Sequence, residues 1–167
     1  MEIKKLSKII PFKFRLWGGV GTAKEQNGRK VYEKYFVLGY IDARDAMDLL
    51  DEVVGVGNWQ RDHKEIAGNL YAGVALFIDG NRVWKWDCWT ESNTEKEKGE
   101  SSDAFKRACV NWGIGRFLYT LPNLTITAEE AKSHKFGITE FVKEKYRDKL
   151  MEWHNSLSSW LDNNEKN

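Results

Sequence analysis

Residues 59–89 constrain the fold most, because three strand-like stretches follow one another there with only tight turns between them. The middle stretch, residues 70–79, alternates strictly, and the sequence DGN at 79–81 is a hairpin signal leading into residues 82–89. Short turns join antiparallel neighbours, so the pattern predicts a three-stranded antiparallel sheet. Apolar residues occur on both sides of the middle strand. Both faces are therefore expected to be at least partly covered, with a neighbouring subunit as one candidate cover.

A long helix is predicted directly after this sheet, within residues 99–119. Its apolar residues fall at helical spacing and predict one buried stripe: Ala104, Phe105, Ala108, Cys109 and Trp112. Ser101 or Ser102 can cap the first turn, and Gly113 and Gly115 end the helix. The polar residues 90–100 before it are expected to form a linker or a lead-in to the helix. Together these segments predict an α+β fold with a β-β-β-α core.

Lys106 and Arg107 are adjacent and fall off the apolar stripe, so both are expected to face outward. Most surface pairs of this kind are simply solvated. The alternative is a phosphate clamp, in which arginine supplies a bidentate fork and lysine a point charge. Helical spacing alone leaves both interpretations open.

Additional helices are expected on both sides of this core. Asp42 is a suitable N-cap for a helix through Val54, and Arg44 lies in its first turn, where the helix dipole disfavours a cation. Arg44 is therefore either placed for a role other than helix stability or an ordinary surface arginine. From Thr139 onward apolar residues recur every three or four positions, which predicts one helix. It is expected to pack back on its own domain, or else to dock on a neighbouring subunit.

The first forty residues give weaker signals. Residues 1–15 are basic and apolar by turns and are expected to form an arm or a first strand. The glycine-rich residues 18–22 lack the spacing of a phosphate-binding loop and are interpreted as an ordinary loop. Residues 30–41 are rich in tyrosine, valine and phenylalanine and predict a strand.

Composition limits the ligands, metal sites and cell compartment that can be expected for this chain. The chain has 26 basic and 25 acidic residues, so a nucleic-acid site must come from local clustering of charge. Cys88 and Cys109 have no zinc-site spacing and are expected to be buried free thiols in a reducing cytoplasm. No apolar run is long enough to span a bilayer, and the lysine-rich start is too short and polar for a signal peptide. A soluble, intracellular protein is expected, with no membrane association.

Catalytic patterns are weak. No nucleophile–histidine–acid arrangement stands out, and no metal or cofactor is expected. Asp79, Asp87 and Glu91 approach a nuclease pattern, but Ser-Asn-Thr follows Glu91 where that pattern needs a lysine. A metal-dependent DNA-processing enzyme is therefore only an alternative, and we expect no enzymatic activity.

Two sequence blocks nevertheless carry a family resemblance. SSDAFKRA followed by WGIGRFLY, and YIDARDAMDLLDEVVGVGNWQ at residues 40–60, resemble the Rad52/Rad22 family of single-strand annealing proteins, nearest its bacterial and bacteriophage branch. The resemblance covers residues 16–122, with the blocks in the family's order and at about its spacing. It implies an annealing domain, which we place at residues 1–130, followed by a helical extension at residues 131–167.

The resemblance also implies a function. Similar proteins bind single-stranded DNA without ATP, anneal complementary strands in homologous recombination and repair, and form homo-oligomeric rings or helical filaments. They hold the phosphate backbone in a basic groove with the bases exposed. Lys106 and Arg107 carry over as phosphate contacts and Arg44 as a contact from the preceding helix, whereas Arg116 is added on charge and position alone.

This sequence departs from the family at two positions. Val110 stands where eukaryotic members carry a further arginine, and Val56 lies about where they place a tyrosine. The groove is therefore expected to carry less charge, unless Arg116 or the lysine-rich N-terminus compensates. A DNA-end-protecting module that binds without annealing is a further alternative. A single-strand binding protein or a recombinase remains open as a partner, in a bacterial or phage-infected cell.

Overall fold

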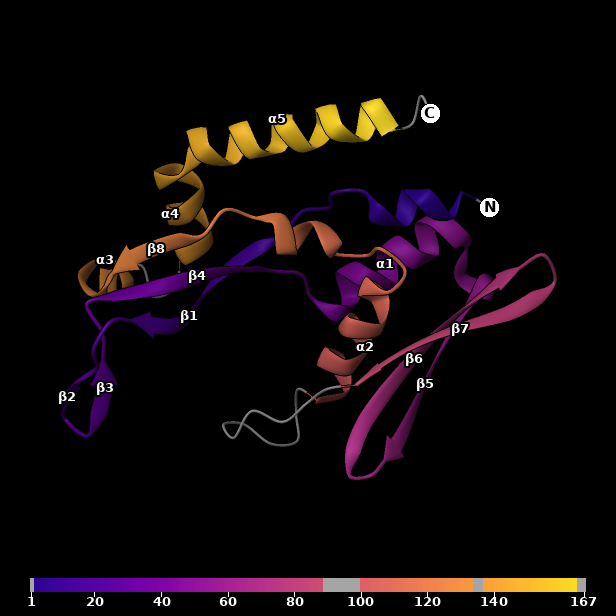
Figure 1. The fold of residues 1–167 in the computed structure, drawn as a ribbon, viewed down its shortest axis with the longest axis horizontal. Coiled ribbons are helices and arrows are strands. Elements are labelled where there is room, and N and C mark those ends of the chain that lie inside the picture. The colour runs from indigo at the N-terminus through magenta and orange to yellow at the C-terminus, as the bar shows by residue number, and fades with distance from the viewer. Residues whose placement is uncertain (1, 89–99, 134–136, 165–167) are drawn as a thin grey trace. The chain divides into compact units, whose positions relative to one another are not determined.

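The computed structural model describes residues 2–88, 100–133 and 137–164 (Figure 1). The predicted linker up to residue 99, with Glu91, lies outside these described residues. The described strands are β1 (Lys13–Val20), β2 (Lys24–Gln26), β3 (Arg29–Val31), β4 (Lys34–Tyr40), β5 (Trp59–Ile66), β6 (Asn69–Ile78), β7 (Asn81–Cys88) and β8 (Leu124–Thr127). The described helices are η1 (Ile3–Ser7), α1 (Ala43–Val54), η2 (Val56–Asn58), α2 (Glu100–Val110), η3 (Arg116–Thr120), α3 (Ala128–Ser133), α4 (Ile138–Lys145) and α5 (Arg147–Asn164).

The chain forms two compact units, each assembled from two separate stretches. Unit 1 contains Met1–Pro11 and Ile41–Tyr119, and unit 2 contains Phe12–Tyr40 and Thr120–Asn167. The boundary predicted at residue 130 falls inside unit 2. The architecture is α+β, with antiparallel sheets in both units.

Unit 1 contains the predicted β-β-β-α succession. Strands β5, β6 and β7 form an antiparallel sheet in that order, and their bounds lie within one residue of the prediction. Ala67-Gly68 and Asp79-Gly80 both have positive φ, as two-residue hairpin turns require. The helix α2 packs on β6 and β7, and α1 packs against α2 (Figure 1).

Both faces of β6 are covered, as predicted. Ala72, Val74 and Leu76 are buried on the face that carries α2. On the opposite face the cover comes from the sheet itself, because the Trp86 ring lies over Gly73, where an added Cβ would be 2.7 Å from the indole. No neighbouring subunit is needed to cover the centre of this strand.

All five residues of the predicted stripe on α2 are buried, but the helix ends at Val110, before the predicted glycines. The chain turns there because Gly113 N–H donates to Val110 O and Ile114 N–H donates to Cys109 O. Gly113 and Gly115 lie in these turns with positive φ. The helix begins at Glu100, so Ser101 lies inside its first turn. Ser101 Oγ lies 3.0 Å from His63 Nε2 on β5.

The helix α1 agrees with its prediction. Asp42 and Asp45 form a reciprocal capping box at its start, and Gly55 ends it with a φ of 89°. The N-terminal arm is part of unit 1, since Leu6 of η1 is fully buried.

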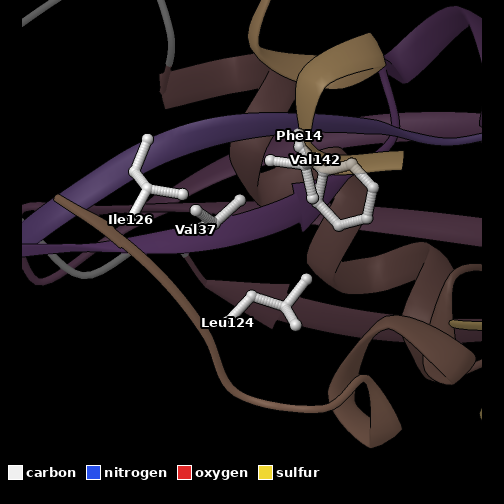
Figure 2. Close-up of a cluster of buried hydrophobic side chains, with 5 residues drawn as sticks. All are labelled: Phe14, Val37, Leu124, Ile126 and Val142. Carbon is white, nitrogen blue, oxygen red and sulfur yellow. The ribbon is translucent and has the colours of Figure 1, made fainter. Parts of the chain in front are cut away.

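Unit 2 contains a second three-stranded antiparallel sheet, in the order β1-β4-β8, which the sequence did not predict. One face of this sheet and α4 enclose a buried apolar cluster (Figure 2) made of Phe14, Val37, Leu124, Ile126 and Val142. Phe12, Leu150 and Tyr146 pack against this cluster. Unit 2 therefore has a core of its own.

Two predictions for this part of the chain were wrong. Residues 18–20 of the predicted loop belong to a strand, because β1 continues to Val20 with a shift of register at Gly18, whose φ is +58°, and only residues 21 and 22 lie outside a strand. The Tyr32 ring lies on Gly19, where a Cβ would be 1.8 Å away. The strand predicted at residues 30–41 is divided between β3 and β4.

The C-terminal segment consists of two helices rather than one, because the chain breaks at Tyr146 between α4 and α5. The Tyr146 hydroxyl donates to the Thr125 carbonyl, and the Trp153 ring meets Phe12 edge-on at 6.4 Å. The described part of this segment thus packs on its own unit, the first of the two alternatives. Among the described residues, every helix is too short or too polar to cross a bilayer.

Candidate nucleic-acid interface

The position of α2 on its sheet decides which side chains it presents to solvent. Phe105 is fully buried, and Trp112 Nε1 donates a 2.9 Å hydrogen bond to Val74 O of β6. These contacts fix the rotation of the helix about its axis. Lys106 and Arg107 then lie on the outer side, as predicted.

Both cations are paired with carboxylates. Lys106 Nζ lies 2.8 Å from Asp103 Oδ1 on the same helix, and Arg107 Nε lies 3.3 Å from Asp87 Oδ1 on β7. The Lys106 side chain is 27% exposed and that of Arg107 is 49% exposed. Pairs this open to solvent contribute about 0–1 kcal/mol, so an arriving phosphate can replace the carboxylate at low cost.

The other two predicted residues lie on different elements. Arg44 is exposed in the first turn of α1 and forms no ion pair with another described residue. Arg116 follows the helix α2, and one of its terminal nitrogens donates a 2.9 Å hydrogen bond to Val110 O. Arg116 therefore closes the C-terminal end of α2, a structural role that charge and position did not indicate. The structure brings Lys106, Arg107 and Arg116 onto one helix and its end, with Arg44 on another helix.

Sequence reasoning missed two further cations beside α2. Arg61 on β5 and Lys85 on β7 both pair in register with Val74, on the face that carries the helix. The Arg61 guanidinium lies 5.8 Å from the Phe105 ring centre. Lys85 Nζ donates to Asn111 O at 2.8 Å and lies 4.3 Å from the Trp112 ring centre. Aligning the three predicted strands in antiparallel register would have placed Arg61 and Lys85 on either side of Val74.

The acidic residues considered for a nuclease site do not meet. Asp79 lies in the β6–β7 turn, whereas Asp87 pairs with Ala72, six residues along the strand from Asn81. At the usual rise per residue, these carboxylates are separated by roughly 20 Å. Among the described residues, no cluster of histidine, cysteine and acidic side chains could hold a metal ion.

The two cysteines differ in burial. Cys109 is fully buried, and this burial raises the pKa of its thiol to about 12, so it stays protonated at neutral pH. Cys88 is half-buried, and both thiols are free.

Comparison with known proteins bears on the same segment. Residues 70–136 match the family described as Rad52/22 family double-strand break repair protein, a stretch that includes β6, β7 and α2 with both of its cations. This stretch is similar to the Rad52/Rad22 family. The resemblance drawn from the sequence is thereby confirmed for this part of the chain.

Two curated relatives are also similar to part of this chain. A single-stranded DNA-binding protein DdrA from Deinococcus deserti is 33% identical over 98 residues, which cover 58% of this chain and 48% of the relative. Its namesake from Deinococcus radiodurans is 31% identical over 98 residues, covering 58% of this chain and 47% of the relative. The matched stretch spans about half the length of each relative. No solved structure shows significant similarity to the chain.

Proposed function

We propose that this chain binds single-stranded DNA and anneals complementary strands in recombination and repair, without ATP and as a homo-oligomeric ring or helical filament. The observation that carries the proposal is the pair Lys106–Arg107, turned outward from a rigid helix inside the segment that matches the Rad52/Rad22 family. Both relatives are named as single-stranded DNA-binding proteins, which supports the same ligand.

Annealing needs no covalent step. Two polyanions must approach one another, so their phosphates have to be neutralised, and their bases must stay unpaired with the pairing edges free. A cation row that follows the backbone meets both needs, provided that several subunits repeat it along the strand. This is why the proposal includes an oligomer.

The proposed contact at α2 is an exchange of partners. A phosphate oxygen would replace Asp103 at Lys106 and Asp87 at Arg107, and both carboxylates would return to water. Arg107 uses only its Nε towards Asp87, so its terminal nitrogens remain available for bidentate contact with a phosphate.

Arg44 and Arg116 complete the proposed set. Arg44 has no acidic partner among the described residues, so no carboxylate must be displaced before it meets a phosphate. Arg116 commits one terminal nitrogen to Val110 O and keeps its other donors.

The decisive experiment is the double variant Lys106→Ala/Arg107→Ala, with binding to a single-stranded oligonucleotide measured over a range of salt concentrations. We expect weaker binding and a salt dependence flatter by about 0.7 for each phosphate that is no longer neutralised. Lys143→Ala/Lys149→Ala is the matched control, because it removes two exposed lysines of α4 and α5. If the α2 variant kept the parental affinity and slope, these residues would not belong to the site.

A second experiment separates annealing from its alternatives. Complementary dye-labelled oligonucleotides are mixed with the protein in the absence of nucleotide, and pairing is followed in time. We expect faster pairing. Binding without acceleration would favour an end-protecting module, and strand cleavage in Mg²⁺ would favour a metal-dependent enzyme. The same proposal places the protein in the cytoplasm, with a single-strand binding protein or a recombinase as further partner classes.

A further inference from the structure

The β1-β4-β8 sheet has one face turned away from the cluster of Figure 2. Phe14 and Val37 point into that cluster, so the residues that alternate with them point the other way. The register sets Lys13 beside Tyr40, Arg15 beside Leu38 and Trp17 beside Phe36. We call the face that carries Lys13, Arg15 and Trp17 of β1, with Lys34, Phe36, Leu38 and Tyr40 of β4, the open face.

Large apolar side chains on the open face are exposed to solvent. Trp17 is 60% exposed, Leu38 38% and Phe36 37%. Because Trp17 and Phe36 are directly opposite one another on neighbouring strands, their rings start from Cβ atoms about 5 Å apart. Neither ring makes an aromatic or cation–π contact with another described residue. Single exposed apolar residues are ordinary, but three on one sheet face indicate a binding surface.

The charged strand residues of the open face are all cations, and the nearby Glu130 carboxylate of α3 accepts a hydrogen bond from the hydroxyl of Thr127, the strand partner of Lys34. Lys13 and Arg15 on β1 and Lys34 on β4 point from it, and the strand residues that share this face include no aspartate or glutamate. The Arg15 guanidinium lies 5.5 Å from the Tyr40 ring centre and forms no ion pair with a described acidic residue. Exposed planar rings between cations fit single-stranded nucleic acid, whose bases stack while its phosphates are neutralised.

We propose that the open face is a second binding surface for single-stranded DNA, separate in residues from the α2 site. Bases stack on Trp17 and Phe36, and Arg15 and Lys34 contact the phosphates on either side. The proposal shares its ligand with the proposed function and rests on it to that extent, but all of its residues lie outside the matched segment 70–136. A second copy of the chain fits less well, because a two-fold contact would oppose like charges.

The test compares an oligothymidylate with an abasic strand of the same length and charge, using fluorescence polarisation. The intact protein should prefer the strand with bases. Trp17→Leu/Phe36→Leu keeps apolar side chains but removes the planar rings, so it should bind oligothymidylate about tenfold more weakly and lose this preference. Tyr119→Leu is the matched control, since Tyr119 is 72% exposed and lies in unit 1, and it should keep the preference.

Each other outcome has a defined meaning. An unchanged preference in the double leucine variant overturns the open-face proposal and leaves the α2 site standing. A fall in solution mass of that variant without DNA assigns the face to a second copy and also overturns it. Failure of the intact protein to bind either strand overturns this inference together with the proposed function. Should the double variant fold poorly by circular dichroism, Arg15→Gln/Lys34→Gln replaces it and should flatten the salt dependence by about 0.7 for each phosphate released.

Discussion

Each unit packs helices on one face of a three-stranded antiparallel sheet, and the two sheets differ in how the other face is covered. In the β5-β6-β7 sheet, Trp86 lies over Gly73 and stacks on Trp84 at 5.1 Å, while Lys64 Nζ lies 4.4 Å from the Trp86 ring centre. In the β1-β4-β8 sheet, the residue opposite Trp17 is Phe36 rather than a glycine, and the Trp17 side chain is exposed. The two sheet faces thus differ in whether a large ring can pack over a glycine of the neighbouring strand.

The cations of the two proposed DNA-binding surfaces differ in whether an acidic residue lies beside them. Lys106 and Arg107 each have an aspartate partner, whereas the strand residues of the open face include no acid. Contact with phosphate at α2 must first displace carboxylates, whereas contact through Arg15 and Lys34 on the open face need not. The two surfaces are therefore expected to respond differently when acidic residues are removed.

The largest expected effect contrasts two phenylalanines. Phe105 is fully buried on the apolar side of α2, so Phe105→Ala should lower the free energy of unfolding by about 3–5 kcal/mol. Phe36 is 37% exposed, and Phe36→Ala should cost less than about 1 kcal/mol. Urea denaturation of both variants measures the difference, and equal losses would show that the open face is part of a packed core.

Gly73→Ala should have the next largest effect. The new Cβ would lie 2.7 Å from the Trp86 ring, so the indole must lift off the strand, at a cost of about 1–3 kcal/mol. Gly57→Ala is the control, because a Cβ there meets nothing within 4 Å. The penalty at Gly73 should shrink in a Trp86→Leu background, and an undiminished penalty would mean that the ring does not cause it.

Removing the acids beside α2 should strengthen DNA binding modestly. Asp87→Asn with Asp103→Asn frees both cations, and we expect affinity for a single-stranded oligonucleotide to rise by up to about fivefold. Asp148→Asn/Glu152→Gln changes the net charge equally from exposed positions on α5 and serves as control. Equal gains in the two variants would point to net charge rather than to the α2 ion pairs.

The smallest effect concerns the end of β8. Lys145 donates a hydrogen bond to Glu130, and Thr127 N–H adds another, so the pKa of Glu130 falls from 4.5 to about 2. A lowered pKa stabilises the folded state above pH 4.5, and this stabilisation is lost as the pH falls from 4.5 towards 2. Glu130→Gln should cost less than about 1 kcal/mol at pH 7, since solvent screens the pair. Thermal melts of both proteins should converge near pH 2, and a gap that widened in acid would contradict this assignment.

Local patterns in the sequence were sufficient for the β5-β6-β7 sheet and for the buried side of α2 in unit 1. Strict alternation located β6, the DGN turn located the hairpin, and helical spacing located the buried stripe of α2. Each of these signals lies within about a dozen residues, so no knowledge of distant segments was needed. The end of α2 was misplaced because the chain already leaves the helical pattern at Asn111 and Trp112, whose N–H groups donate to Ala108 O and Cys109 O, before Gly113 is reached.

Unit 2 could not be predicted in this way because its sheet joins distant segments. β8 has only four residues and pairs with β4, more than eighty positions earlier. The break between α4 and α5 at Tyr146 contains no glycine or proline that would predict it from the sequence. It coincides with a tertiary hydrogen bond from Tyr146 to Thr125. The candidate site shows the same limit, because helical spacing predicted that Lys106 and Arg107 face outward, whereas the Asp87 partner comes from another element.

The interleaved order of the two units has a consequence for synthesis on the ribosome. Residues Ile41–Tyr119 are continuous, so most of unit 1 can assemble as soon as they have emerged. The β1–β4 hairpin is made earlier but must wait for partners near the C-terminus, since Phe14 N–H donates to Thr139 Oγ1, 125 positions away. Long-range closure of this kind is slow and leaves apolar strands unprotected meanwhile. Chains released before β8 is complete should therefore aggregate through this early hairpin, although their first unit is already folded.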